Sequence, residues 1–187
     1  MTIDIDEKTR LELTAEKHAV ALYAAIDSNR AHLSRFLPWV NNMQSMEAFR
    51  NYIKNCELLY QHGKEVSFVI IQDEIAVGRI GLHHLDLHNK NASIGYWLTK
   101  DAEGKGIITK ACRALISYGF KELGLHRIEI KAATENIRSQ AIPEKLQFKK
   151  EGILRQAEWV NNQFLDLFVY SILNFEWSSE PTNSATA

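Results

Sequence analysis

Residues 94–116 read IGYWLTKDAEGKGIITKACRALI, with two glycines between an apolar stretch and an amphipathic one. The aromatic and β-branched residues 94–98 are typical of a buried strand, and the apolar residues after Gly106 recur at helical spacing. The turn Gly104-Lys105-Gly106 therefore precedes a helix, where free backbone N–H groups and the macrodipole favour an anion. Because glycine has no Cβ, this turn lets a phosphate approach closely, although a plain strand-to-helix turn is the alternative.

Two common phosphate-binding motifs do not match this turn. A P-loop needs a glycine at position 99 and a Ser or Thr at position 106, where the chain has Thr99 and Gly106. The dinucleotide fingerprint GxGxxG needs a third glycine, where the chain has Thr109. The turn therefore predicts a phosphate-bearing ligand of another kind.

The composition is that of a soluble globular protein. The 187 residues are 45% hydrophobic and 24% charged, and the formal net charge is −1. This charge gives no basic excess for a nucleic-acid backbone or a membrane surface. The start, MTIDIDEKTR, lacks the layout of a signal peptide, so we expect a cytoplasmic protein with no nucleic-acid and no membrane partner.

No internal repeat or linker divides the chain. We therefore predict a single domain over residues 1–177, a length that can bury a substantial core. Residues 178–187, SSEPTNSATA, have no apolar periodicity and predict a disordered tail.

Cysteines and histidines give no sign of a metal site. Cys56 and Cys112 are far apart in the chain and are predicted to be reduced core residues. His83 and His84 are adjacent on a predicted strand, so their side chains point to opposite faces. Neither these two nor His88 has a carboxylate or cysteine at metal-ligand spacing, so we expect no metal.

The order of elements indicates an α/β or α+β sandwich around one mixed sheet. Asn161-Asn162-Gln163 predicts the turn of a C-terminal hairpin, because asparagine tolerates positive φ. The predicted strands are residues 10–13, 66–71, 75–85, 94–98, 127–132, 151–160 and 164–173, and the predicted helices are residues 16–27, 30–36, 46–62, 107–120 and 137–146.

Three stretches resemble a known family: IGYWLTKDAEGKGIITKA (94–111), NIRSQAIPEKLQFKKEG (136–152) and the C-terminal hairpin. They are similar to the GNAT superfamily of N-acetyltransferases, and within it to the RimJ/RimL branch that acetylates the N-termini of ribosomal proteins. The resemblance runs from about residue 8 to residue 175. It implies the GNAT fold, with a mixed, mostly antiparallel sheet of six to seven strands, a splay between the central strands and helices on both faces.

The resemblance also implies acetyl-CoA as the co-substrate. The family's Q/R-x-x-G-x-G/A loop binds the pyrophosphate of coenzyme A, and its two glycines fall on Gly104 and Gly106. The splayed strand would offer free backbone N–H groups to the pantetheine and the thioester carbonyl, with a plain core strand as the alternative. The cofactor-binding residues implied are Trp97, Leu98, Thr99, Glu103, Gly104, Lys105, Gly106, Ile107, Ile108 and Thr109, together with Asn136 and Ser139.

The chain departs from the family pattern at three positions. Asp101 stands where the motif has Gln or Arg, and Glu103 stands where the branch often carries Arg. Gln147 replaces the glycine of the usual K-L-G-F at a helix end. In addition, Pro143 removes the N–H that would bond to the Ser139 carbonyl, so we expect a kink or an early helix end there.

Three residues are implied in catalysis by the resemblance. Asn136 and Ser139 match the family's N-x-x-S, which lies beside the pantetheine and the sulfur, and helix capping is the alternative for both. Glu158 matches the proposed general base of the branch, and a surface glutamate beside a turn is its alternative. Tyr170 is a second candidate for the acid, although a tyrosine in an apolar strand is more often core.

The acceptor amine is open at this stage. In the RimJ/RimL branch, Phe36 and Trp39 correspond to a wall of the substrate site, with core packing as the alternative. The leading hypothesis is acetylation of the N-terminal α-amine of a protein such as a ribosomal protein. The alternatives are acetylation of a small-molecule amine, such as a polyamine or aminoglycoside, and a non-catalytic module that senses coenzyme A. A homo-oligomer is possible in each case.

Overall fold

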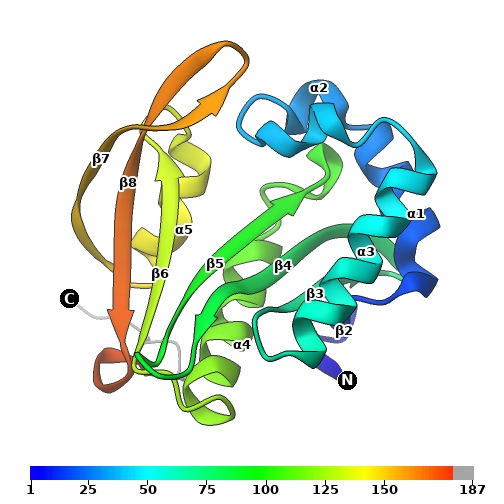
Figure 1. Ribbon diagram of the computed structural model, residues 1–187. Coiled ribbons are helices and arrows are strands. Elements are labelled where there is room, and N and C mark those ends of the chain that lie inside the picture. Colours follow the sequence, from blue (N-terminus) through cyan, green and yellow to red (C-terminus); the bar gives the residue numbers. More distant parts are fainter. Residues whose placement is uncertain (179–187) are drawn as a thin grey trace.

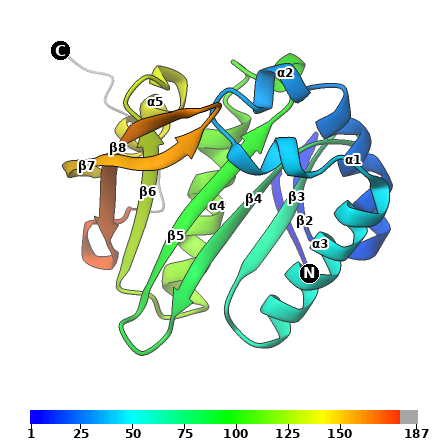
Figure 2. The same ribbon diagram turned by 45° about the horizontal axis from the view of Figure 1, so that its top comes forward.

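The computed structural model describes residues 1–178, which build a twisted sheet with helices on both faces (Figures 1 and 2). The predicted tail lies outside the described residues from residue 179 onward. The strand order is β1-β2-β3-β4-β5-β6-β8-β7, and only the β5–β6 pair is parallel. The strands are β1 (Thr2–Asp6), β2 (Thr9–Leu13), β3 (Val66–Gln72), β4 (Ile75–Asp86), β5 (Asn91–Leu98), β6 (Arg127–Ala133), β7 (Lys149–Val160) and β8 (Gln163–Leu173). The mixed, mostly antiparallel sheet is confirmed.

The sheet has eight strands in the described residues, rather than the predicted six to seven. The additional strand is β1, which pairs with β2 at one edge of the sheet. Its Ile3 and Ile5 pack on the core, while the acidic residues between and after them are exposed. A short edge strand with charges on one side gives a weak sequence signal, because only two apolar residues alternate.

The two faces of the sheet carry different helices. Helices α1 (Ala19–Asp27) and α3 (Met46–Gln61) pack against Val69 and Ile71, whereas α4 (Ile107–Lys121) packs against Phe68 and Ile70. Because β3 is covered on both faces, its sequence VSFVII reads as a continuous apolar run. Helix α5 (Ile137–Lys145) lies on the same side as α4 (Figures 1 and 2). No helix in the described residues is long and apolar enough to span a membrane.

The predicted helix at residues 30–36 is shorter than expected. Helix α2 (Arg30–Leu33) ends early, and the short helix η2 (Pro38–Asn42) follows it. Pro38 disfavours helical backbone at the residue before it, and Leu37 accordingly has the extended values φ −118° and ψ 99°. The proline therefore divides this segment into two short turns.

Of the kink or early helix end predicted at Pro143, the early end is wrong. Helix α5 continues two residues past the proline, to Lys145. Pro143 cannot donate to the Ser139 carbonyl, but the Tyr96 hydroxyl donates to that oxygen at 3.1 Å. The Tyr96 side chain on β5 thus gives the Ser139 carbonyl the hydrogen bond that Pro143 cannot give.

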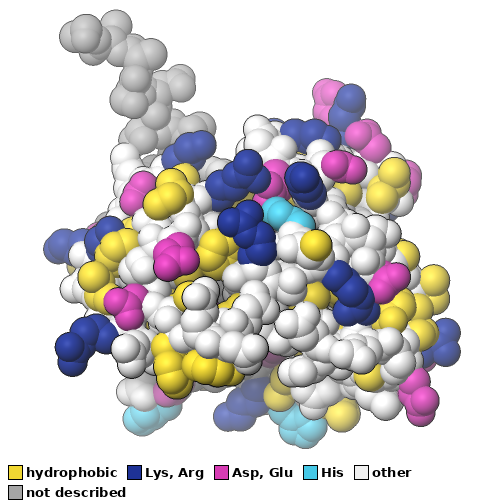
Figure 3. Space-filling view, turned by 90° about the horizontal axis from the view of Figure 1, so that it is seen from above, with side chains coloured by type: hydrophobic (Ala, Val, Ile, Leu, Met, Phe, Trp, Pro, Cys, Tyr) yellow, Lys and Arg dark blue, Asp and Glu magenta, His cyan; other side chains and the backbone are white. Residues whose placement is uncertain are grey.

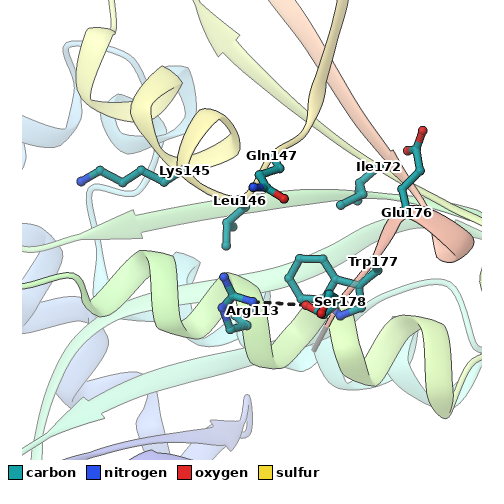
Figure 4. A pocket seen from close by; sticks show the side chains of 8 residues that line it. All are labelled: Arg113, Lys145, Leu146, Gln147, Ile172, Glu176, Trp177 and Ser178. Carbon is teal, nitrogen blue, oxygen red and sulfur yellow. Dashed lines mark hydrogen bonds between the residues drawn. The ribbon is translucent and has the colours of Figure 1, made fainter. Parts of the chain in front are cut away.

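Gln147 takes the backbone conformation that the family's glycine usually provides. Its φ is 61°, and the N–H groups of Gln147 and Phe148 donate to the carbonyls of Glu144 and Pro143. This bonding pattern is a Schellman cap, in which the residue at the left-handed position is normally glycine. In Figure 4, Gln147 is drawn with Trp177 and six other residues around a small pocket between α4 and the end of α5, and none of the eight belongs to the implied site.

We expect Gln147→Gly to raise the free energy of unfolding by about 1 kcal/mol, because it removes left-handed strain from a residue with a Cβ. The Gln147 side chain is exposed, so its loss removes little packing. Denaturant unfolding would measure the change. Gln147→Ala is the matched control, since it also removes the side chain but keeps the Cβ. A stabilisation of the same size in the alanine variant would contradict the backbone explanation.

Candidate active site

The turn before α4 has the geometry of an anion site. Gly104 and Gly106 both have φ of 75°, and a Cβ built on either would meet no heavy atom within 4 Å. The glycines are therefore required by backbone conformation and leave open space in front of the helix. At this end of α4, the Lys110 N–H donates a backbone hydrogen bond to the carbonyl of the N-cap Gly106. The N–H groups before it, at Ile107, Ile108 and Thr109, are those that a helix leaves without an intrahelical acceptor. The side chains of Ile107 and Ile108 are buried in the core, so these residues can contribute only backbone groups.

Glu103, the acidic departure in this loop, is held between two basic groups. Its Oε1 lies 3.0 Å from His32 Nε2 on α2, and its Oε2 pairs with Arg138 Nη1 on α5. Lys105 is exposed beside the loop, as is Asp101. Figure 3 looks down on this end of the molecule and shows Lys and Arg side chains gathered near the middle, with a histidine and an acidic group between them. The pairing with Arg138 offsets the charge of Glu103 beside the turn.

Strands β5 and β6 separate beside this turn. They pair only from Asn91 opposite Arg127 to Ile94 opposite Ile130. Beyond that point β5 still pairs with β4 as far as Leu98, and β6 still pairs with β8 as far as Ala133. The predicted splay is therefore confirmed. Residues 95–98, which include Trp97 and Leu98, have no strand partner on their β6 side, and this edge has backbone groups available to a ligand.

Asn136 and Ser139 lie at the start of α5. Asn136 is the N-cap, and its Oδ1 accepts a hydrogen bond from the Ser139 N–H at 3.2 Å. Capping is thus one observed function of Asn136, and its Nδ2 group is left to interact with a ligand. Ser139 is half-buried, and its Oγ lies 3.1 Å from Tyr96 Oη on β5.

Glu158 is half-buried near the tip of the β7–β8 hairpin. It lies opposite Leu165, after an irregularity in the pairing between Leu154 and Glu158. Residues directly opposite in an antiparallel pair share a face, and Leu165 belongs to an apolar cluster with Val160, Leu167 and Phe36. Burial raises the pKa of Glu158 above its ordinary value. Glu158 is thus a carboxylate with increased basicity in partly apolar surroundings.

Ser139 and Glu158 lie on opposite faces of the sheet. The Tyr96 side chain reaches α5, whereas the next residue, Trp97, packs against Trp39 of η2 at 6.3 Å between ring centroids, with the rings tilted by 55°. Successive strand residues point to opposite faces, so the α5 side carries Ser139 and the η2 side carries Glu158 and its apolar cluster. The separation of β5 from β6 lies between the two faces. An acyl donor held on one face and an amine on the other could therefore meet there.

The hairpin tip contacts the segment between α2 and η2. Asn161 Nδ2 donates to the Ser34 carbonyl at 2.9 Å, and Phe36 packs against the hairpin's apolar cluster. Asn161 and Asn162 have φ of 49° and 62°, and Val160 pairs with Gln163. The predicted hairpin is confirmed, with a two-residue turn whose positive φ values match the twist of the strands. This contact covers the Glu158 side of the splay.

The other candidate groups are engaged by other partners or are exposed, and Tyr170 lies on the same face of the sheet as Tyr96. The Tyr170 hydroxyl donates to Glu144 Oε1 at 3.3 Å, which engages the second candidate acid. His83 pairs with Glu65 at 2.9 Å, and His84 is exposed. Among the described residues, no three His, Cys, Asp or Glu side chains are grouped so that they could hold a metal ion. Both cysteines are free and buried.

Two features of the site were not predicted from the sequence. The contact of Tyr96 with Ser139 joins residues 43 positions apart, and only Pro143 signals that the Ser139 carbonyl needs an outside donor. The pairing of Glu103 with His32 and Arg138 likewise depends on three separate elements. In both cases the partners are set by the fold and not by local spacing.

The splayed sheet and the glycine turn at the start of α4 are the features expected of the acetyltransferases that the sequence resembles, and comparison with known proteins agrees. A family model described as acetyltransferase (GNAT) domain matches residues 9–149. The protein YdaF of Bacillus subtilis (strain 168) is 38% identical over 180 residues, which cover 96% of this chain and 98% of that protein. The ribosomal-protein-serine acetyltransferase of Escherichia coli (strain K12) is 34% identical over 170 residues, 91% of this chain and 95% of that enzyme.

A solved structure of RimL, a ribosomal L7/L12 α-N-protein acetyltransferase in complex with coenzyme A, superimposes with a TM-score of 0.90. It is 28% identical, and the match covers 92% of this chain and 98% of that one. The chain belongs to the GNAT acetyltransferase family. It is an N-acetyltransferase that uses acetyl-CoA.

Proposed function

We propose that the enzyme acetylates the N-terminal α-amine of a protein, with a ribosomal protein as the acceptor and the cytoplasm as its place of action. The observation that carries this proposal is the half-buried Glu158, which lies across the splayed sheet from Ser139. The similarity to an enzyme named for ribosomal-protein serine supports the acceptor class. Formation of a homo-oligomer stays a prediction, which size-exclusion chromatography with light scattering would test.

The turn and the splayed strand fit acetyl-CoA as the acyl donor. The N–H groups from Gly104 to Ile108 would bind the diphosphate, with Thr109 as a hydroxyl donor and Lys105 as a nearby positive charge. The Glu103 N–H, which the resemblance also implied, already donates to the Lys100 carbonyl at 3.2 Å. The unpaired edge of β5 at Trp97 and Leu98 would hold the pantetheine and the thioester carbonyl. Thr99 follows the strand, and its N–H already donates to the Val77 carbonyl at 2.8 Å. Asn136 would fix the pantetheine arm through its free amide group.

We expect Gly106→Ala to weaken coenzyme A binding by roughly 10- to 150-fold, the effect of losing 1.5–3 kcal/mol of hydrogen bonding to a charged group. The alanine keeps a strained positive φ, and its Cβ projects into the space in front of the helix. Titration calorimetry with coenzyme A would measure the change. Gly63→Ala is the matched control, because Gly63 has φ of 63° and the same open surroundings at the end of α3. An equal loss of affinity in the control would contradict the assignment of the turn.

The proposed chemistry assigns one proton acceptor and one hydrogen-bond donor. Glu158 removes a proton from the acceptor ammonium, directly or through a water, and the freed lone pair attacks the thioester carbon. The C–N bond forms while the carbonyl π electrons move to oxygen, where the β5 N–H groups stabilise them. When the carbonyl reforms, the C–S bond breaks with its electrons on sulfur, and Ser139 donates a hydrogen bond to that sulfur. The attacking nitrogen loses its second proton as the amide forms, and the sulfur takes up one proton through water, so one ammonium and one thioester give one amide, one thiol and one proton.

An α-amine makes a modest demand on this base. Deprotonating an amine of pKa about 8 at pH 7 costs roughly 1.4 kcal/mol, against about 4.6 kcal/mol for a lysine-like amine near 10.4. A glutamate whose pKa is raised by burial is better matched to deprotonating an α-amine than a lysine-like amine. The contact between the hairpin tip and the α2–η2 segment also favours an acceptor that enters by its chain end.

An acceptor panel tests the function. Thiol release from acetyl-CoA is followed with peptides that carry ribosomal-protein N-termini, with the same peptides blocked at the α-amine but containing lysine, and with spermidine and an aminoglycoside. We expect turnover with free N-terminal peptides and none with blocked ones. Turnover with spermidine or the aminoglycoside alone would overturn the proposed acceptor and favour a small-molecule amine.

A further inference from the structure

One tyrosine hydroxyl contacts Ser139 at two atoms. Tyr96 Oη lies 3.1 Å from Ser139 Oγ and 3.1 Å from the Ser139 carbonyl oxygen. Tyr96 belongs to β5 and Ser139 to the first turn of α5, which follows β6. The contact therefore crosses the region where β5 and β6 have no hydrogen bonds between them.

The Ser139 carbonyl needs a donor from outside its own helix. In an α-helix it would accept from the N–H of the residue four positions later. That residue is Pro143, which has no N–H, and α5 still continues to Lys145. The Tyr96 hydroxyl supplies the missing hydrogen bond, which accounts for one of its two contacts.

The second contact is to the group proposed to act on sulfur. A tyrosine hydroxyl can donate one hydrogen bond and accept others. While Tyr96 donates to the carbonyl, the Ser139 O–H can donate to Tyr96; when the serine turns toward a developing negative charge, Tyr96 remains within reach to donate to Oγ. Burial raises the pKa of Tyr96 well above its ordinary value, so its hydroxyl stays protonated. The contact thus restricts Oγ to one place on the α4–α5 side of the sheet.

We propose that Tyr96 is a positioning residue for Ser139, and that its hydroxyl fixes Ser139 Oγ so that the serine O–H faces the sulfur of the departing thiol. This inference rests on the role proposed above for Ser139. Tyr96 exchanges no proton with the substrates, and the bonds made and broken are those already described. Loss of the Tyr96 hydroxyl should therefore lower turnover, and it should do so only when the Ser139 hydroxyl is present.

Pro143 allows the two contacts of Tyr96 to be tested separately. Tyr96→Phe removes both, whereas in Tyr96→Phe/Pro143→Ala the new alanine N–H can bond to the Ser139 carbonyl. We expect the double variant to match Pro143→Ala in thermal stability but to have kcat lower by about tenfold, the size of one hydrogen bond. The KM for acetyl-CoA should stay within about twofold, as expected for an interaction used in the transition state. In a Ser139→Ala background, Tyr96→Phe should lower kcat no further.

Two results would overturn the inference. If Pro143→Ala restores kcat together with stability, Tyr96 serves only the carbonyl. If Tyr96→Phe lowers the KM for acetyl-CoA and leaves kcat unchanged, the contact only obstructs the space between β5 and β6 and does not position Ser139 Oγ. Ser139→Ala separates this inference from the proposed function, because normal turnover in that variant would remove Ser139 itself from the mechanism, whatever Tyr96 does.

Discussion

Glu158→Gln is expected to lower kcat for the amine acceptor by about 10²- to 10⁴-fold, the contribution typical of general acid–base catalysis. Glutamine keeps the size and shape of the side chain but cannot accept the ammonium proton. Coenzyme A binding should be unaffected, because the turn at Gly104 and Gly106 lies at a separate element. Steady-state kinetics and coenzyme A titration on the same preparation would measure both quantities.

The pH profile gives an independent test of the same residue. A base must be ionised to accept a proton, so kcat/KM is low below the pKa of Glu158 and rises as the pH passes through it. Burial raises that pKa, so the rise should occur at higher pH than for an exposed glutamate. In Glu158→Gln this acidic limb should disappear, and the remaining pH dependence should follow the amine.

The matched control is Glu122→Gln, at the far end of α4, where the same change should leave kcat unaltered. If Glu158→Gln retains full turnover with both α-amine and small-molecule acceptors, Glu158 is not the base. A retained acidic limb in that variant would lead to the same conclusion, since another group would then be titrating.

The parts of the site that depend on local backbone conformation could be predicted from sequence. Gly104 and Gly106 follow a strand and precede a helix, and only the residue type was needed to infer a turn that is open to an anion; the structure adds that both have positive φ. The Asn161-Asn162 turn was predictable for the same reason, because asparagine at positive φ is a local property. The splay was different, since it came from resemblance to a family and from no periodicity in β5 or β6.

The parts that depend on tertiary contacts could not be predicted in this way. Nothing near Tyr96 indicates that its hydroxyl reaches Ser139, and a tyrosine in an apolar strand reads as core. Pro143 was read as a helix breaker, because its missing N–H was visible in the sequence and the replacement donor was not. The proline therefore suggested an early helix end that does not occur, because a side chain from another element bonds to the open carbonyl.

A buried ion-pair network around Arg79 was also invisible in the sequence. Arg79 lies on β4, directly opposite Trp97 of the splayed strand, and is 6% exposed. Its Nη2 lies 2.7 Å from Glu65 Oε1 and 2.5 Å from Ser67 Oγ, and its Nη1 bonds to the Tyr52 hydroxyl. Glu65 also pairs with His83. All these partners lie on the face covered by α3, so the network joins that helix to the sheet beneath the site.

Arg79→Met is expected to lower the free energy of unfolding by roughly 3–5 kcal/mol, the usual cost of removing one partner from a buried ion pair. Methionine fills much of the volume but leaves the Glu65 carboxylate and the Tyr52 hydroxyl without their cation. Chemical denaturation at neutral pH would measure the loss. Lys110→Met is the matched control, because Lys110 pairs with Asp6 at the surface and its removal should have a much smaller effect.

Acid titration of stability tests whether Arg79 helps to keep the Glu65 carboxylate charged beside His83. Burial alone would raise the pKa of Glu65, but its hydrogen bond with His83 and the charge of Arg79 lower it to about 2. A carboxyl with a depressed folded-state pKa contributes stability above its unfolded value of 4.5, and loses that contribution as the pH falls from 4.5 to about 2. In Arg79→Met the pKa of Glu65 should rise, so this loss on acidification should shrink. If the variant instead shows the full acid dependence of the parent protein, Arg79 does not hold the Glu65 charge. Its effect on stability would then come from its hydrogen bonds to Tyr52 and Ser67 and from packing against α3.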